Sequence, residues 1–144
     1  MASFTESIDA WVAETKERLD AVHGRSVELL GEELANTKPE GGRVPFLTGN
    51  LARSLLASKS GMPNTTDGPY AGSNIGLIAA TLKADETVYM GYQAIYAARM
   101  NFGYVGADSL GRVYNQQGNY FIEGAVAEWP NIVKTAVSEI KGKA

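Results

Sequence analysis

Few residues in this chain belong to the types that usually perform chemistry. A single histidine, His23, stands between Val22 and Gly24, and the chain has no cysteine. A histidine-dependent triad or a multi-histidine metal site therefore has at most one member available. The lack of cysteine also excludes disulfide bonds, thiolate zinc sites and a cysteine nucleophile. We expect His23 to be a solvated or capping residue, and we expect the protein to use no metal and no cofactor.

Two other patterns are compatible with catalysis but are better explained without it. Residues 106–111 read Gly-Ala-Asp-Ser-Leu-Gly, which resembles a nucleophile elbow, but alanine stands where the first glycine belongs and no apolar strand precedes it. The adjacent acids Glu32-Glu33 and Asp85-Glu86 could act as an acid and a base. On a helix face and in a turn, however, such acids are most simply solvated charges. The sequence therefore predicts no catalytic residue and no enzymatic activity.

Charge and hydropathy exclude further classes. Thirteen basic residues against sixteen acidic ones give a net charge of −3, without a basic block that could bind a phosphate backbone. The longest nearly apolar stretch, 75–82, has about eight residues, whereas a membrane-spanning helix needs about twenty. We expect no secretion signal and no membrane partner. The length of 144 residues and the 44% of hydrophobic residues predict one folded domain over residues 1–144.

A long helix is expected at the start of the chain. Ser3 and Glu6 have the spacing of a capping box, and apolar residues then recur at intervals of three and four. This pattern predicts one helix over 3–36, about 50 Å long, which Gly24 could kink or break. The apolar stripe consists of Phe4, Ile8, Trp11, Val12, Leu19, Val22, Leu29, Leu30 and Leu34.

A short helix and two long loops are expected next. Thr48 is placed to cap a helix over 50–56, whose apolar face includes Leu51. The stretches 58–74 and 103–119 are rich in glycine and polar residues and are too long for simple connections. We expect both to be flexible in the isolated chain and to become ordered against neighbouring proteins.

The second half of the chain predicts strands and an amphipathic helix. The stretches 75–82 and 87–92 have the composition of strands and predict a hairpin, and 94–102 predicts a short helix. Residues 120–141 form an amphipathic pattern in which Pro130 should cause a kink, or a break after which it opens the second half. The predicted fold class is α+β, with a long N-terminal helix, a short second helix, a small antiparallel sheet with a hairpin, and an amphipathic C-terminal helix.

Tyrosines are concentrated in the second half of the chain. Six of the seven lie there, among them Tyr104 and Tyr114. Half-buried tyrosines beside glycine-rich loops suit protein contact surfaces, because tyrosine provides a large area at a low entropic cost. Packing within the core and the sheet explains them equally well.

Three short motifs, in order along the chain, carry a family resemblance. Residues 48–54 read Thr-Gly-Asn-Leu-Ala-Arg-Ser, residues 96–103 read Tyr-Ala-Ala-Arg-Met-Asn-Phe-Gly, and residues 120–125 read Tyr-Phe-Ile-Glu-Gly-Ala. Together they resemble the minor tail or tail-completion (neck) proteins of long-tailed bacteriophages, whose motifs are Asp-Thr-Gly-x-Leu-x-x-Ser, Tyr-Ala-x-x-x-Glu-Phe-Gly and Pro-Phe-x-x-Pro-Ala. The chain departs from that pattern at Leu47, at Asn101 and at both prolines of the last motif.

The resemblance implies a structural virion protein without enzymatic activity, made in the host cytoplasm. It would form a hexameric ring in the neck, complete or cap the tail, and join the tail to the head connector. Its partners would be further copies of itself, the connector or stopper proteins, and the tail terminator or tube. DNA would pass through the lumen without specific binding, which an acidic balance favours. The alternatives are a tail terminator or head-closure ring and, in another class, a monomeric ligand-binding or catalytic α+β domain.

The first helix also predicts how such a ring closes. A stripe of about 50 Å is longer than a globule of about 15 Å radius of gyration can cover, so part of it should stay exposed in a monomer. Because large aromatic residues dominate interface energies, we expect the helix to form a head-to-tail interface. Arg53 would pair with an acid of a neighbour if it faces one. The expected interface residues are Phe4, Ile8, Trp11, Arg53, Tyr104 and Tyr114, and the expected structural turn comprises Thr48, Gly49 and Leu51.

Overall fold

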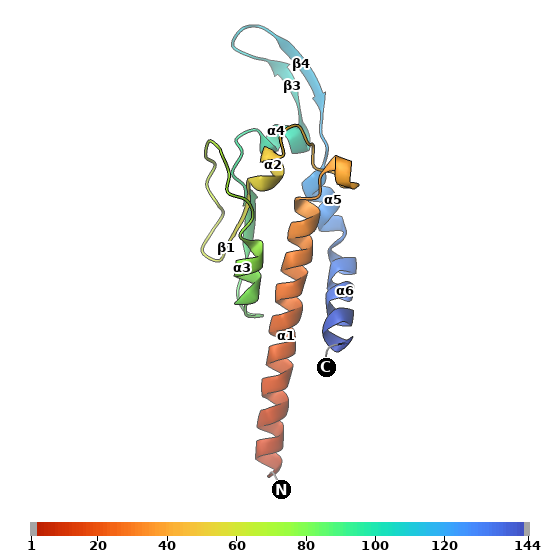
Figure 1. Cartoon of the computed structure of the whole chain (residues 1–144). Helices are drawn as coiled ribbons and strands as arrows, with labels where there is room; N and C mark the ends of the chain where they lie inside the picture. The colour runs from red at the N-terminus through yellow and green to blue at the C-terminus, as the bar shows by residue number, and fades with distance from the viewer. Residues whose placement is uncertain (1–2, 143–144) are drawn as a thin grey trace.

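The computed structural model of the chain describes residues 3–142 and is elongated (Figure 1). Its helices and two small antiparallel sheets confirm the α+β class. In chain order the elements are α1 (Phe4–Leu34), the 3₁₀ turn η1 (Lys38–Glu40), α2 (Asn50–Arg53), β1 (Leu55–Ser58), α3 (Ile75–Ala80), β2 (Tyr89–Tyr92), α4 (Ala97–Phe102), β3 (Gly103–Ala107), β4 (Val113–Gln117), α5 (Phe121–Ala127) and α6 (Trp129–Gly142).

Helix α1 is a single helix, as predicted, and its sequence explains why. The hydroxyl of Ser3 accepts a hydrogen bond from the Glu6 N–H at 3.2 Å, and the Glu6 carboxylate accepts one from the Ser3 N–H at 2.8 Å. This is the predicted capping box. Gly24 does not break the helix. A Cβ atom at Gly24 would lie 2.7 Å from the backbone oxygen of Ala79, so this glycine lets α3 approach α1 closely.

Only the C-terminal half of α1 belongs to the body of the molecule. Helix α6 lies along one side of this half and α3 along another (Figure 1). The N-terminal half extends beyond both of them (Figure 1). The buried residues of α1 are accordingly all in its second half: Gly24, Ser26, Val27, Gly31 and Leu34.

The hairpin predicted over residues 75–92 is wrong. Residues 75–80 form helix α3, and β2 pairs antiparallel with β1 instead, with Leu55 opposite Tyr92. The helix predicted over 50–56 is correspondingly too long, because the chain turns into strand β1 at Leu55. The reason is tertiary packing. A helix places Ile75 against Gly31 of α1, which outweighs the strand propensity of the apolar run.

The stretch 103–119, for which the sequence suggested at most a short strand at 113–114 within an exposed loop, contains a β-hairpin that projects from one end of the molecule (Figure 1). Strands β3 and β4 pair antiparallel, and the Asp108 side chain organises the turn between them. Its carboxylate accepts hydrogen bonds from the N–H groups of Leu110 and Arg112, each at 2.9 Å. The segment that resembles a nucleophile elbow is therefore a hairpin tip and not a strand-to-helix turn.

The closing amphipathic segment breaks at the predicted proline. Helix α5 ends at Ala127 and α6 begins at Trp129, so Pro130 lies in the first turn of α6. A proline is tolerated there because the first-turn N–H groups have no partner within the helix. The predicted break, with Pro130 opening the second half, is confirmed.

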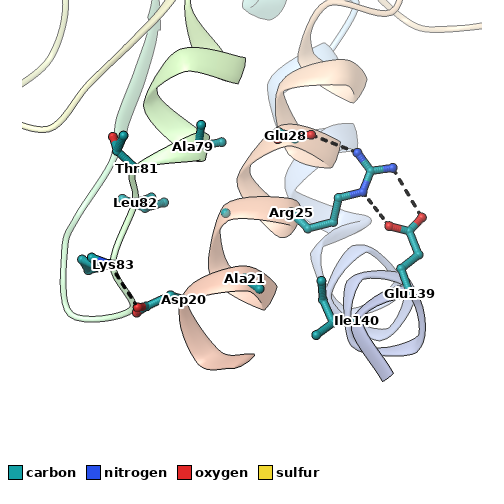
Figure 2. Close-up of a pocket in the computed structure, with 12 residues that line it drawn as sticks. Asp20, Ala21, Arg25, Glu28, Ala79, Thr81, Leu82, Lys83, Glu139 and Ile140 are labelled. Carbon is teal, nitrogen blue, oxygen red and sulfur yellow. Dashed lines mark hydrogen bonds and ion pairs between the residues drawn. The ribbon is translucent and has the colours of Figure 1, made fainter. Parts of the chain in front are cut away.

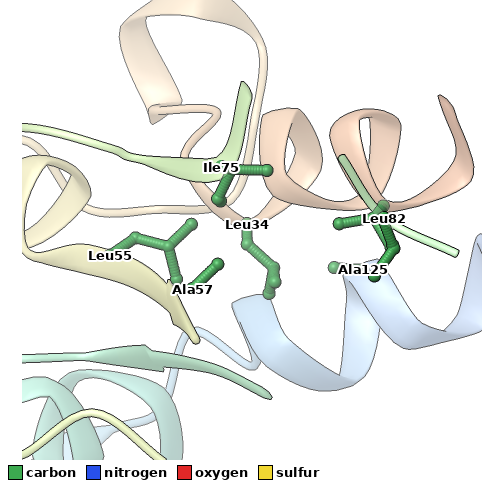
Figure 3. Packing of buried hydrophobic residues seen from close by; sticks show 7 residues of the cluster. Leu34, Leu55, Ala57, Ile75, Leu82 and Ala125 are labelled. Carbon is green, nitrogen blue, oxygen red and sulfur yellow. The ribbon is translucent and has the colours of Figure 1, made fainter. Parts of the chain in front are cut away.

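Two clusters of buried hydrophobic residues form the core. The first lies between α1, α3, β1 and α5 (Figure 3), and it comprises Val27, Leu34, Leu55, Ala57, Ile75, Leu82 and Ala125. The second lies around α2, α4 and the start of α5, and it comprises Val44, Leu51, Ala94, Ala97 and Phe121. The rings of Phe121 and Tyr92 meet edge to face, with centroids 5.2 Å apart, at the boundary of the second cluster.

The turn before α2 is built differently from the prediction. The N-cap residue is Gly49, with φ of +80°, and not Thr48. The Thr48 hydroxyl accepts only a long hydrogen bond, 3.4 Å, from the Asn50 N–H. Arg53 closes the turn, because its Nη2 donates to the Thr48 carbonyl at 2.9 Å and to Asn50 Oδ1 at 2.6 Å. Leu51 is buried in the second cluster, as expected.

This geometry predicts which residue of the turn matters for stability. Thr48→Ala should lower the free energy of unfolding by less than about 0.5 kcal/mol, since it removes one long and exposed hydrogen bond. Gly49→Ala should cost about 1 to 2 kcal/mol, because alanine is disfavoured at positive φ. Urea unfolding of the two variants measures the difference. A larger loss for Thr48→Ala than for Gly49→Ala would contradict the structure of this turn.

Candidate interaction site

A polar cleft lies where α1 meets α3 and α6, and oppositely charged side chains that line it are paired (Figure 2). Its volume is about 570 Å³. Arg25 Nε of α1 donates to the Glu139 carboxylate of α6 at 2.6 Å, and Arg25 Nη1 donates to Glu28 at 3.1 Å. The hydrogen bond to Glu139 contributes most to raising the pKa of Arg25 above its ordinary value, and the bond to Glu28 raises it further. On the other side of the cleft, Lys83 Nζ lies 3.6 Å from the Asp20 carboxylate. These pairs hold α1 against α6 and against the turn that follows α3.

The lone histidine and Glu86, one of the acids singled out in the sequence, have structural contacts as well. His23 Nε2 lies 3.0 Å from the backbone oxygen of Glu86. The Glu86 carboxylate accepts hydrogen bonds from the Lys83 N–H at 2.8 Å and from Lys59 Nζ at 3.2 Å. Both bonds hold the pKa of Glu86 below its ordinary value. Residues 3–142 contain no group of three or more histidine and acidic side chains that could hold a metal ion.

Tyr104 and Tyr114 brace the β3–β4 hairpin. Their ring centroids are 6.1 Å apart, and the guanidinium carbon of Arg99 lies 4.0 Å from the Tyr104 centroid. The Tyr114 hydroxyl donates to Asp108 at 3.1 Å. Burial would raise the pKa of Asp108, but hydrogen bonds, led by those from Arg112, hold it below its ordinary value. Both tyrosines thus have packing roles within the chain, and their contact with a neighbouring copy stays a prediction.

The N-terminal half of α1 is an exposed amphipathic arm. We call residues 4–19 the helical arm. Among the residues that the structure describes, no other element covers it, and 82% of Phe4 and 65% of Trp11 are exposed. At 3.6 residues per turn, its large apolar side chains fall within about 100° of the helix circumference, and its acids point elsewhere. The apolar face of the arm consists of Phe4, Ile8, Trp11, Val12 and Leu19.

A second uncovered apolar surface lies at the other end of α1. We call it the apolar groove; it runs between the end of α1, strand β2 and helices α4 and α5, with a volume of about 460 Å³. None of the described residues that line it is charged. Tyr92 is mostly buried beside it, which raises the pKa of its hydroxyl, and that hydroxyl donates to the Leu34 carbonyl. The exposed side chains of the groove include Met62, Ile95, Phe102 and Val126.

The structure separates the expected interface residues into three places. Phe4, Ile8 and Trp11 lie on the helical arm, Arg53 lies in its own turn before β1, and the two tyrosines lie on the hairpin. The arm and the hairpin are at opposite ends of the molecule (Figure 1). No single surface of the chain therefore contains all of these residues.

Comparisons of the chain with models of protein families, with curated proteins and with solved structures find no match. Within residues 3–142, no helix combines the length and the apolar character needed to cross a membrane. The functional argument therefore depends on the shape and the surface chemistry of the chain itself.

Proposed function

We propose that this chain is a structural virion protein of the phage neck. Copies of it form a ring that completes or caps the tail and joins it to the head connector, with a channel for DNA. The observation that carries the proposal is the area that a single copy leaves exposed. The chain exposes 9354 Å², whereas a compact monomer of its mass would expose about 7,200 Å².

The excess area is sufficient for the contacts of a ring. An ordinary protein interface covers about 800 Å² on each partner, and a ring subunit must supply two different patches, one for each neighbour. The excess of about 2,200 Å² exceeds that requirement. Its distribution also suits a ring, because the helical arm and the hairpin project from opposite ends of the body (Figure 1).

The three motifs that resemble the tail-completion family support the same proposal. They are separated in the sequence, but one residue of each, Leu51, Ala97 and Phe121, belongs to the second core cluster. The three motifs therefore lie around one part of the fold, and this shared position supports the proposal. The net charge of −3 is also consistent with a DNA channel, because an acidic protein does not attract the phosphate backbone.

The mass and the shape of the particles that the purified protein forms test the proposed function. Analytical ultracentrifugation over a range of concentrations, with negative-stain electron microscopy, should show particles of several copies with a central hole. Labelling of the protein in phage particles then separates a tail-completion protein from a tail terminator or a head-closure ring by its position. A monomer at every concentration that binds a small metabolite would contradict the proposal and favour a ligand-binding domain.

Trp11→Ala is expected to weaken association between subunits by at least about 30-fold, the effect of losing an aromatic interface anchor. Its melting temperature as a monomer should stay close to that of the wild type, because Trp11 is exposed in the monomer. Leu77→Ala is the matched control, since Leu77 is also exposed but lies on α3. Equal association of the two variants, or a large loss of monomer stability in Trp11→Ala, would overturn this assignment.

A further inference from the structure

We propose that the helical arm of one subunit docks in the apolar groove of the next copy of this chain. The inference rests on the proposed assembly of several copies and adds which two surfaces meet. Both surfaces are exposed in the isolated chain, both are apolar, and both exclude charge from their centre. An amphipathic helix that lays its apolar face into a hydrophobic groove is a recurrent mode of recognition.

The two surfaces cannot meet within one subunit. Trp11 on the arm and Leu30 at the groove belong to the same unbroken helix, and their positions along its axis differ by about 28 Å. The arm points away from the body in which its own groove lies (Figure 1). Any contact between arm and groove is therefore a contact between copies.

The side chains of the two surfaces match in kind. Phe4, Ile8 and Trp11 have the i, i+4, i+7 spacing by which a helix anchors itself in a groove. The groove offers Met62 and Met90, whose flexible thioethers adapt to the shape of an inserted aromatic ring. The acids of the arm lie outside its apolar face, so docking leaves them in water.

The contact also determines how copies assemble. Arm and groove are different patches, so the interface is heterologous, and each copy can donate one arm and accept one. Such a contact repeats from copy to copy and closes into a ring when the rotation allows it. Two patches of about 800 Å² fit within the excess exposed area of about 2,200 Å². A second copy is therefore an occupant that the exposed area can accommodate.

Single cysteines test this contact directly, because the chain has none of its own. Val12→Cys places a thiol on the apolar face of the arm and keeps Trp11, while Ala98→Cys and Thr65→Cys place thiols in the groove. Mixed under mild oxidation, Val12→Cys with either groove variant should give at least about tenfold more mixed dimer than with the control Ala80→Cys. Ala80 is an exposed alanine of α3 outside the groove.

The outcomes separate this inference from the proposed function. Equal cross-linking to Ala80→Cys, preferential cross-linking of Val12→Cys to itself, or no cross-linking at the highest soluble concentration would each overturn arm docking. Rings seen by electron microscopy without the arm-to-groove cross-link would keep the neck function and overturn only the docking. A specific cross-link in open chains without rings would support the docking and contradict the ring. In the Val12→Cys background, Trp11→Ala should reduce the specific cross-link at least about tenfold, whereas Leu77→Ala should leave it unchanged.

Discussion

Phe121→Ala should lower the free energy of unfolding by about 3 to 5 kcal/mol. Phe121 is 1% exposed and is the largest of the fully buried side chains among the described residues. Its removal would leave a cavity in the second core cluster and would abolish the edge-to-face contact with Tyr92. Since domains of this size are stable by only about 5 to 15 kcal/mol, the variant should unfold at a much lower urea concentration. Urea titration followed by circular dichroism measures the loss.

Phe4→Ala is the matched control for this truncation. Phe4 is the same side chain on the exposed face of the helical arm, so its removal should change the stability of the monomer by no more than about 0.5 kcal/mol. A similar loss for both variants would mean that the arm is folded against the body. A small loss for Phe121→Ala would mean that the three family-like motifs do not share a core.

Elements with long and regular hydrophobic patterns could be predicted from the sequence. The capping box at Ser3, the unbroken helix α1 and the break before Pro130 all follow from local rules that act within a few residues. The strand predicted over 75–82 was wrong because the apolar residues of this run suit a strand and a buried helix equally well. The close approach of α3 to Gly24 and Gly31 decides between them, and that approach is a tertiary contact.

The candidate site shows the same division between local and tertiary information. The exposed arm could be expected from arithmetic, because a helix of that length exceeds the body it packs against. The apolar groove could not. Its walls come from the end of α1, the loop before α3, β2, α4 and α5, which only the fold brings together. Likewise, the hydrogen bonds that hold Arg53 within its own turn depend on the backbone conformation at Gly49.

Asn101 shows how one difference from the bacteriophage family that the motifs resemble is accommodated in this fold. Where the family has a glutamate before Phe-Gly, this chain has a fully buried asparagine at the end of α4. Its Nδ2 donates to both carboxylate oxygens of Glu123 at 3.0 Å, and its Oδ1 accepts from the Ile122 N–H at 3.0 Å. The side chain thus provides a hydrogen-bond acceptor for a backbone N–H in the first turn of α5. Tyr120, which precedes this turn, has a positive φ of 49°.

Asn101→Asp should therefore destabilise the protein at pH 7, by about 3 kcal/mol, because it sets a second carboxylate against Glu123 in a buried position. The nearby negative charge and the burial raise the pKa of the new carboxyl group above its ordinary value near 4. Below that value the group is protonated in both the folded and the unfolded chain, so the penalty is small. The penalty grows as the pH rises through the raised pKa of the folded state. The difference in unfolding free energy from the wild type, measured by urea titration from pH 4 to pH 7, should increase in that direction.

The double variant Asn101→Asp/Glu123→Gln isolates the cause. It exchanges donor and acceptor: the glutamine amide can donate to the new carboxylate, which can still accept from the Ile122 N–H. At least about half of the stability lost at pH 7 should return, and the dependence on pH should become weaker. If the double variant is as unstable as Asn101→Asp at pH 7, the loss comes from burying a charge and not from two facing carboxylates. A pH-independent difference between Asn101→Asp and the wild type would show that no titrating group is responsible, and that Asn101 acts through its shape alone.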